Sequence, residues 1–405
     1  MSADIALVSP YPSERDPGSS GVAWYSQSLA RALADAGAEV TVLAPGHVPA
    51  GGVPDHDGPV RVDRRFGRGP RAALAALAAA GDTGAPVVHV QHEAFLYGGP
   101  ASVPAVLAGL AGLRRAGRGP VVTMHQVVDP RSVDHRFTDM HRVSIPPVAA
   151  RASLRGMQTA ISRTASRVIV HEEAFRRTIP GAVVFPLGGG STPAGGPAVA
   201  ARAAALRAEA GVPDGGLLAL CFGFVAPYKG VELALEAARL AGPEVRLVVA
   251  GGEHPRLAGQ GYLDGLRDRY GPVAAFTGYI DDADVSPWFL AADVVLLPYP
   301  QPFSSSGVLA HAVSHRVPTL VSSALAEVIG FPPEAALPPD PVAVAARLAD
   351  LAGDRGGLAE LAALTAGTGA GRSWPELAER HLGLYEEVVH AQRRAHRLPR
   401  RRPRR

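Results

Sequence analysis

The chain has 40 basic residues, and only one of them, Lys229, is a lysine. Ala, Gly and Pro are also abundant, a bias typical of GC-rich coding sequences, which replace Lys by Arg where the chemistry permits. Lys229 lies near the end of the segment CFGFVAPYKG (residues 221–230), where an apolar run gives way to a helical pattern. An ammonium group between a strand and a helix is suited to hold a phosphate as a point charge. The alternatives are a surface lysine or the Schiff-base lysine of a pyridoxal-phosphate enzyme.

Two further segments lie where a strand pattern runs into a helical one. They are Gly18, Ser19, Ser20, Gly21 and Val22 in the first half of the chain, and Ser304, Ser305, Ser306 and Gly307 in the second. Glycines let the backbone approach a ligand, and free N–H groups at a helix N-terminus attract anions. A plain turn explains the first segment equally well, and a serine N-cap accounts for part of the second. Together with Lys229, the two segments predict a diphosphate held between two halves of the molecule.

The elements that position these residues alternate regularly along the chain. Apolar runs predict strands at residues 5–9, 40–44, 87–91, 121–125, 167–170, 183–185, 217–222, 245–250, 275–277, 294–298 and 319–321. Helical patterns separate them, for example at 22–36, 230–241, 262–270, 307–314 and 341–351. Continuous apolar strands alternating with helices are typical of parallel sheets covered on both faces. The sequence therefore predicts an α/β protein with two Rossmann-like domains whose ligands bind in the cleft between them.

A stretch rich in small residues indicates where one domain ends and the next begins. A first domain over 1–187 is followed by a Gly/Pro-rich linker over 188–211 and a second domain over 212–372. A helix over 373–393 is expected to cross back to the first domain, and residues 394–405 form a basic tail that we expect to be disordered.

The basic balance of the chain comes from its last residues. The segment 391–405 holds eight Arg and no acid, so the formal charge of the remaining 390 residues is 3 − 8 = −5. A mildly acidic body argues against a nucleic-acid partner, which would require a basic stripe on the folded part. The tail is expected to be solvated or to contact an anionic membrane surface.

Targeting and redox features are sparse. The N-terminus shows no signal-peptide pattern, and no apolar run reaches the ~18 residues of a membrane helix. Cys221 is the only cysteine, so no internal disulfide can form. These features predict a soluble, cytoplasmic protein that could be peripheral to the inner face of the membrane.

In order and spacing, these segments resemble those of the family 4 glycosyltransferases of the GT-B fold, which retain anomeric configuration. The resemblance covers nearly all of residues 1–390. Besides the glycine and serine segments, it rests on VAWY (22–25), VHVQHE (88–93), VTMH (122–125), YKG (228–230), VVAGG (248–252), FTGYI (276–280) and AADVVLLPY (291–299).

The resemblance implies a role for each matching residue. The catalytic residues would be His125, beside the reacting sugar, and Lys229, on the pyrophosphate. The donor sugar nucleotide would be bound by Gly18, Ser19, Ser20, Gly21, Val22, Phe224, Lys229, Gly252, Tyr279, Ser304, Ser305, Ser306, Gly307 and His311. The acceptor would be bound by Tyr25, His92 and Glu93. For His125, a histidine bonded to backbone at a strand end is the structural alternative, and a structural role is equally open for Glu93.

The chain departs from the family pattern at three positions. Phe224 replaces an Arg that many relatives carry before the lysine, and Phe303 and His311 replace two glutamates spaced eight residues apart. The second of those glutamates usually holds the nucleotide ribose, so the nucleotide is left unassigned.

The expected reaction moves a hexose from a nucleoside diphosphate sugar to an unidentified acceptor. Lys229 and backbone N–H groups would stabilise the leaving diphosphate without a metal or another cofactor. The other hypotheses are a non-catalytic module that binds a sugar nucleotide or a partner, and the pyridoxal-phosphate enzyme. His311 and His315 lack a third ligand, and the acidic run 281–284 is expected to begin a helix rather than bind metal.

Overall fold

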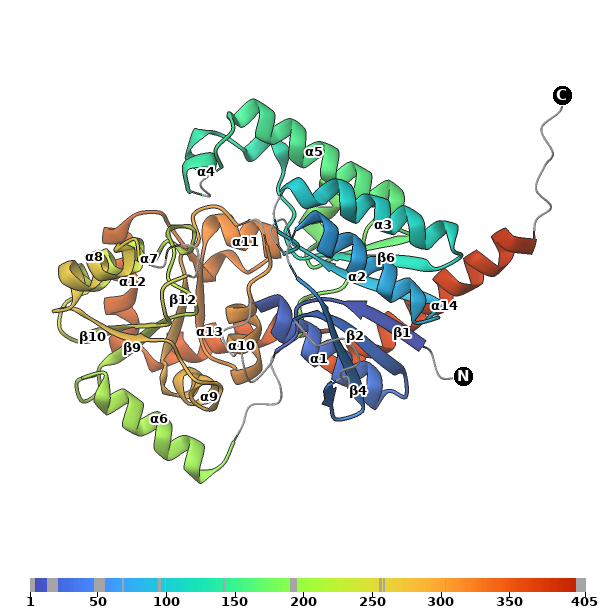
Figure 1. Cartoon of the computed structure of the whole chain (residues 1–405). Helices are drawn as coiled ribbons and strands as arrows, with labels where there is room; N and C mark the ends of the chain where they lie inside the picture. Colours follow the sequence, from blue (N-terminus) through green and yellow to red (C-terminus); the bar gives the residue numbers. More distant parts are fainter. Residues whose placement is uncertain are drawn as a thin grey trace.

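The computed structural model describes residues 4–12, 21–46, 55–67, 69–93, 96–98, 100–140, 143–189, 195–254, 257, 259–302 and 304–397. Two α/β domains lie side by side (Figure 1). The residues predicted to begin the glycine loop, Gly18 to Ser20, lie outside the described residues, as do Phe303 and the tail beyond Arg397.

The N-terminal domain is built on an eight-stranded sheet in the order β3-β4-β2-β1-β5-β6-β7-β8. The strands are β1 (Asp4–Val8), β2 (Glu39–Pro45), β3 (Asp55–Asp57), β4 (Val60–Phe66), β5 (Val87–His92), β6 (Gly119–Met124), β7 (Arg167–Val170) and β8 (Val183–Val184). All neighbours pair in parallel except β3 and β4. The helices are α1 (Gly21–Asp35), α2 (Pro70–Asp82), α3 (Val103–Arg115), α4 (His135–Met140) and α5 (Pro147–Thr164), with the 3-10 helices η1 (Pro100–Ser102), η2 (Pro130–Ser132) and η3 (Glu173–Arg177).

The C-terminal domain is built on a six-stranded parallel sheet in the order β11-β10-β9-β12-β13-β14. The strands are β9 (Leu217–Phe222), β10 (Val245–Ala250), β11 (Ala274–Gly278), β12 (Val294–Leu297), β13 (Thr319–Ser322) and β14 (Ala336–Leu337). The helices are α6 (Pro197–Glu209), α7 (Val231–Ala241), α8 (Tyr262–Tyr270), α9 (Asp282–Ala291), α10 (Gly307–His315), α11 (Ser323–Ile329), α12 (Pro341–Gly353) and α13 (Arg355–Gly367), with η4 (Pro227–Lys229) and η5 (Pro333–Ala335).

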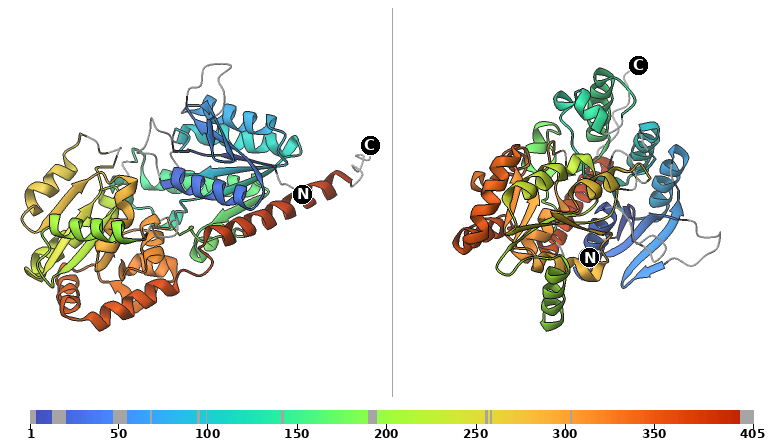
Figure 2. Two further views of the ribbon diagram at one scale, coloured as in Figure 1. Left: turned by 90° about the horizontal axis from the view of Figure 1, so that it is seen from below. Right: turned by 90° about the vertical axis from the view of Figure 1, so that its left-hand side faces the viewer.

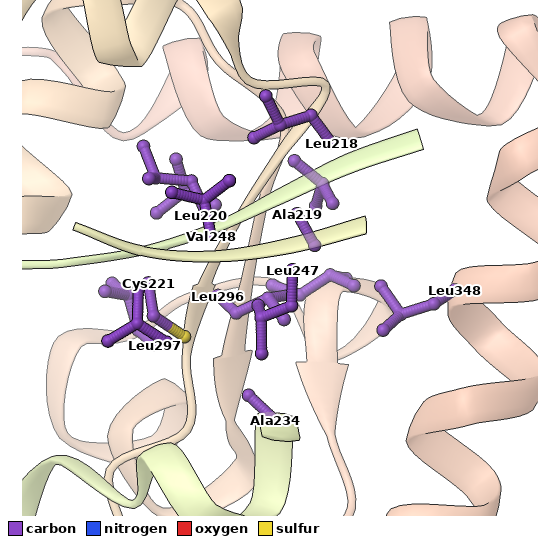
Figure 3. Close-up of a cluster of buried hydrophobic side chains, with 14 of the residues drawn as sticks. Leu218, Ala219, Leu220, Cys221, Ala234, Leu247, Val248, Leu296, Leu297 and Leu348 are labelled. Atoms are coloured by element: carbon purple, nitrogen blue, oxygen red, sulfur yellow. The ribbon is translucent and has the colours of Figure 1, made fainter. Parts of the chain in front are cut away.

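The apolar strands of the second domain form its core. Leu218 and Leu220 of β9, Leu247 of β10 and Leu296 of β12 are at most 1% exposed, and they pack with Leu348 of α12 (Figure 3). Burying a leucine side chain contributes about 2 kcal/mol. This rigid sheet carries the loops at its carboxyl edge, where Lys229 and the serines lie.

The last helix, α14 (Trp374–Arg397), returns from the second domain to the first (Figure 2). Its apolar face packs in one buried cluster with Leu29 and Leu33 of α1. A Cβ on Gly119 in β6 would lie 2.2 Å from Val388 of α14, so the helix and the sheet are in close contact. The helix lies over the residues where the sequence predicted a crossing helix, and it continues to Arg397, past the predicted end at residue 393.

The predicted linker over 188–211 is wrong in its second half, because α6 occupies residues 197–209. Ala203 and Leu206 of this helix are buried in the core of the C-terminal domain. Arg202 anchors it to α9 through Asp284, with an N–O distance of 2.7 Å.

The acidic run 281–284 begins helix α9, as predicted, although Asp281 makes no capping hydrogen bond with its side chain.

Candidate active site

Lys229 lies beyond the carboxyl end of β9 and faces the loop that follows β12. Its Nζ donates to the hydroxyl of Tyr299 at 2.8 Å and lies 4.3 Å from the centre of the same ring. Burial alone would lower the pKa of the ammonium group, but the hydroxyls of Tyr299 and Tyr228 outweigh it, so the pKa is raised. Among the described residues, no carboxylate lies within ion-pair distance of Lys229. The ammonium group is therefore charged and available to an anion.

Tyr299 connects Lys229 to the serine turn, residues 304–306. Its hydroxyl lies 3.2 Å from Oγ of Ser306. Ser306 is the N-cap of α10, and its side chain accepts a hydrogen bond from the N–H of Leu309 at 3.2 Å. The single lysine and the N-terminus of α10 therefore belong to one hydrogen-bonded group, as expected for two elements that hold the same anion.

Gly230 allows this arrangement by letting two loops approach each other. Its φ is 64°, and a Cβ at this position would lie 2.1 Å from the carbonyl oxygen of Pro298. A small pocket opens beside it at the carboxyl ends of β9 and β12, lined by Gly223, Phe224 and Lys229 among others. The glycine after the lysine is therefore required by packing as well as by backbone conformation.

The serine turn also contacts the N-terminal domain. Ser304 forms an isolated antiparallel bridge with Gln126, which follows β6, and the Ser305 hydroxyl donates to the carboxylate of Glu172, which follows β7. Parallel strands end at the same edge of a sheet, so both contacts come from the carboxyl edge of the first domain. The turn is thus the point where the two predicted halves of the site meet.

His125 belongs to a buried chain of polar side chains. The chain consists of Tyr385, His89, Gln91, His125, His171 and the carbonyl of Phe185. Nδ1 of His171 donates to that carbonyl at 2.9 Å, so in the neutral ring Nε2 accepts from Nδ1 of His125 at 3.1 Å. Nε2 of His125 lies 2.8 Å from Oε1 of Gln91. With Nδ1 of His125 donating to His171, Nε2 carries a lone pair, so this tautomer requires the Gln91 amide to be rotated by 180° to present its NH2 group.

Both ring nitrogens of His125 are therefore held by protein groups. The side chain is 7% exposed, and burial, followed by the neighbouring histidines, holds its pKa well below the usual value. The ring is neutral and fixed in orientation. The role predicted for His125 beside the reacting sugar stays a prediction. To contact a sugar, the ring would have to give up its hydrogen bond with Gln91 or with His171.

The residues predicted to bind the acceptor differ in their exposure. Tyr25 is 5% exposed, with its ring edge against His125 at a centroid distance of 4.9 Å. His92 is 4% exposed, its Nδ1 has no hydrogen-bond partner among the described residues, and burial lowers its pKa to about 4. Glu93 is partly exposed and accepts from Gln126 at 2.7 Å. Glu93 is thus the most accessible of the three.

Of the donor-binding residues predicted in the second domain, Phe224 and Lys229 line the small pocket. The Phe224 ring packs edge-on against His254 with a centroid distance of 5.6 Å, so this residue contributes an aromatic contact and no charge to the pocket. Gly252 accepts from the N–H of Val225 at 2.9 Å, and Tyr279 is 50% exposed. In the first domain, Gly21 begins α1 and Val22 is buried behind it.

His311, on α10, is placed by packing against α9. Its ring stacks on Phe289 with a centroid distance of 5.3 Å, and burial lowers its pKa to about 4. His315 uses both of its ring nitrogens, on the carbonyl of His311 and on the hydroxyl of Ser286. Among the described residues, no group of three side chains is arranged to hold a metal ion.

Sequence reasoning missed three residues of this site. Tyr299 appeared only as the end of an apolar run, and neither His171 nor Glu172 was predicted to take part. The signal for the last two was available, because both follow β7 directly and the carboxyl ends of parallel strands converge on one edge.

Two family models match the chain. The model described as Glycosyltransferase Family 4 matches residues 19–183, and the model described as Glycosyl transferases group 1 matches residues 217–354. The chain belongs to the family 4 glycosyltransferases. One model matches each domain of this glycosyltransferase. The first includes Gln126 and Glu172, and the second includes the serine turn that they contact.

Solved structures share its fold over nearly the whole chain. Sucrose-phosphate synthase from Thermosynechococcus elongatus is 22% identical, with a TM-score of 0.72 over 96% of this chain and 100% of the other. HepE from Anabaena in complex with UDP-glucose is 16% identical, with a TM-score of 0.66 over 95% and 99%. Trehalose 6-phosphate synthase from Burkholderia multivorans is 14% identical, with a TM-score of 0.63 over 99% and 100%. These similarities establish the GT-B fold.

Two negative results complete the comparison. A search of curated proteins found no match to this glycosyltransferase. In the part of the chain that the structure describes, no helix has both the length and the hydropathy of a membrane span.

Proposed function

We propose that this glycosyltransferase moves a hexose from a nucleoside diphosphate sugar to an acceptor with retention of anomeric configuration. The observation that carries the proposal is the hydrogen-bonded group of Lys229, Tyr299 and Ser306. It combines a charged ammonium group with the N-terminus of α10 at the carboxyl edge of the sheet. An anion bound there would be held by charge and by backbone N–H groups.

Chemically, sugar transfer requires stabilisation of the negative charge that develops on the leaving diphosphate. Lys229 and the N–H groups that begin α10 supply this stabilisation as preorganised groups. The N-terminus of α1, which begins at Gly21, would face the same diphosphate from the first domain. We propose that these groups are sufficient without a divalent metal ion.

The substrates would bind between the two domains. Solved relatives with this fold include HepE, which is described in complexes with UDP and with UDP-glucose. These complexes support a sugar nucleotide as the donor here. On the acceptor side, Glu93 offers a partly exposed carboxylate at the end of β5.

The experiment is a donor screen followed by product analysis. UDP-, GDP- and ADP-sugars are added to the protein, and the thermal midpoint is measured. A ligand at a hundred times its Kd stabilises the folded state by about 2.7 kcal/mol. For a donor that binds, the proton coupling constant at the anomeric carbon of the product distinguishes retention from inversion. An inverted product would contradict the proposed stereochemistry, and binding without transfer or hydrolysis would contradict catalysis.

A second function, a non-catalytic module that binds sugar nucleotides, is favoured by one observation. At one of the two positions where relatives carry glutamate, the chain places His311, whose ring is stacked on Phe289. The module predicts the same thermal shift as the enzyme but no consumption of donor in the presence of any acceptor. The same screen therefore separates the two functions.

A further inference from the structure

Glu172 is a buried carboxyl group at the boundary between the domains. Its side chain directly follows β7 and its residue is 5% exposed, whereas the side chain of the next residue, Glu173, is 73% exposed and pairs with Arg176. Among the described residues, no cationic group lies within ion-pair distance of Glu172. The cost of burying an unpaired carboxylate favours the protonated form.

The only hydrogen-bond partner found for this carboxyl group in the described part of the chain belongs to the proposed donor site. The hydroxyl of Ser305 donates to it. Ser306, the next residue, connects through Tyr299 to Lys229. A diphosphate bound by Lys229 and the serine turn would therefore lie beside a carboxyl group contributed by the other domain.

The diphosphate and an ionised Glu172 would be two negative groups side by side. Such groups repel each other strongly in a site with little water. In the second domain, Phe224 lines the pocket beside Lys229 and adds no further positive charge. A protonated carboxyl group removes the repulsion and adds a hydrogen-bond donor, which a diphosphate oxygen can accept.

We propose that Glu172 takes up a proton from solvent when the donor binds, and that the neutral carboxyl group donates a hydrogen bond to the diphosphate. This inference rests on the proposed function, because it requires a nucleoside diphosphate sugar at the serine turn. It assigns the N-terminal domain a specific contact with the donor that closes the site from the opposite side.

The charged and titratable groups around Glu172 come from several elements. Arg372, before α14, acts on its charge. His171 precedes Glu172 and bonds His125, while Glu173, Arg176 and Arg177 follow on η3, against which α11 packs with Glu327. Lys229 is connected to Glu172 through Tyr299 and the serine turn, which also begins the helix of His311. The side chains of Glu173 and Glu327 are exposed to solvent, where salt screens their charges.

The direction of the shift at Glu172 agrees with the proposal. Burial raises its pKa, and the opposing effects of Arg372 and of the Ser305 hydroxyl do not reverse this. Burial lowers the pKa of His171 to about 4 and that of His311 to about 4, and it holds the pKa of His125 well below its usual value. With pKa values near 4, His171 and His311 stay neutral over the pH range of the binding experiment, and the lowered pKa of His125 acts in the same direction.

The sign of the effect follows from linkage. The bound donor raises the pKa of Glu172 further, so the complex holds more protons than the free protein between the two pKa values. Donor affinity therefore falls as pH rises through this window, with Kd increasing by up to about tenfold per pH unit.

The experiment measures donor binding by calorimetry between pH 5.5 and 8.5, using UDP-glucose, GDP-glucose and ADP-glucose as probes. A sugar nucleotide is preferred to UDP because a terminal phosphate titrates near pH 6 itself, with a pKa of about 6. In the parent protein, Kd should rise with pH, and the heat of binding in two buffers of different ionisation enthalpy should report net proton uptake.

Glu172→Gln keeps a hydrogen-bond donor but does not titrate, so it should bind with a Kd that is independent of pH. Glu173→Gln is the matched control and should retain the pH dependence of the parent. A parent Kd that does not change with pH, an absence of proton uptake, or a Glu172→Gln variant that keeps the pH dependence would each overturn the inference alone. If no sugar nucleotide binds the parent at any pH, the proposed function fails and the inference fails with it. The proton-uptake measurement needs no variant, so it decides the question even if Glu172→Gln does not fold.

Discussion

Replacing Tyr299 by Phe tests whether the position of the Lys229 ammonium group matters for donor binding, because it removes a hydrogen bond that holds this group and keeps the lysine itself. The hydroxyl accepts from Nζ of Lys229 at 2.8 Å and lies 3.2 Å from Oγ of Ser306, while the ring is 9% exposed and packed in the core. Tyr299→Phe removes the hydroxyl and leaves the ring under the ammonium group. The variant therefore retains the positive charge and its contact with the aromatic face.

The size of the effect can be worked from these contacts. A hydrogen bond that involves a charged group contributes about 1.5–3 kcal/mol. Lys229 is partly exposed, so water replaces part of the lost contact. We expect donor binding to weaken by about 1–2 kcal/mol, which is roughly a 5- to 30-fold rise in Kd.

The assay is calorimetric titration of whichever sugar nucleotide binds, combined with the free energy of unfolding from a denaturant titration. Tyr262→Phe is the matched control, because its hydroxyl donates to Glu232 in the same domain, away from the serine turn. The reasoning is refuted if Tyr299→Phe and Tyr262→Phe bind the donor equally well, since the position of the ammonium group would then not matter.

Three further predictions concern the frame of the site. Gly230→Ala should lower the free energy of unfolding by about 2–4 kcal/mol, because its Cβ would lie 2.1 Å from a carbonyl oxygen, whereas Gly330→Ala, with a φ of 66° and open space around it, should cost only about 1 kcal/mol; equal effects in urea denaturation would contradict the packing argument. Stability should fall as pH drops from 7 toward 4.5, because burial lowers the pKa of His92, His171 and His381 to about 4 each, and the unfolded chain, with ordinary histidines, takes up protons first. Each of these histidines should lower the free energy of unfolding by about 1 kcal/mol at pH 5.5 relative to pH 7. A free energy of unfolding that does not change over this pH range would show that they are not neutral in the folded protein. Tyr385→Phe should destabilise the protein by about 1–3 kcal/mol, because the hydroxyl bonds Nδ1 of His89 at 2.7 Å in the buried chain; an unchanged denaturation midpoint would place that chain outside the determinants of stability.

The sequence predicted much of the fold because buried parallel strands leave a strong pattern. The run 217–222 is apolar throughout and the run 245–250 contains a single charged residue, Arg246, and both were placed to the residue. The edge strand β3 and its neighbour β4 were missed, because their alternating and charged residues do not form such a run. Helix α6 was taken for a linker, since its Ala-rich sequence has only a weak amphipathic pattern and its burial depends on α9.

The site was predictable where one local signal contains the chemistry. Lys229 and the serine turn each lie between a strand and a helix, so short segments revealed them. The contacts of Glu172 with Ser305 and of His125 with His171 join residues far apart in the chain, and only the folded structure brings them together. The neutral state of the histidine chain also depends on burial and on an ordered series of hydrogen bonds, which no short segment encodes.

The central claim is that Lys229 supplies the positive charge that holds the donor diphosphate. The most direct test compares the Kd of the donor for the parent, Lys229→Ala, Lys229→Arg and Arg239→Ala, the last of which removes an exposed charge on α7 that pairs with Glu236. We predict that Lys229→Ala weakens donor binding by about 100-fold or more, corresponding to a loss of roughly 3 kcal/mol, that Lys229→Arg restores part of the affinity, and that Arg239→Ala binds like the parent. A Lys229→Ala variant that is folded and binds the sugar nucleotide with the parent's affinity would contradict the claim.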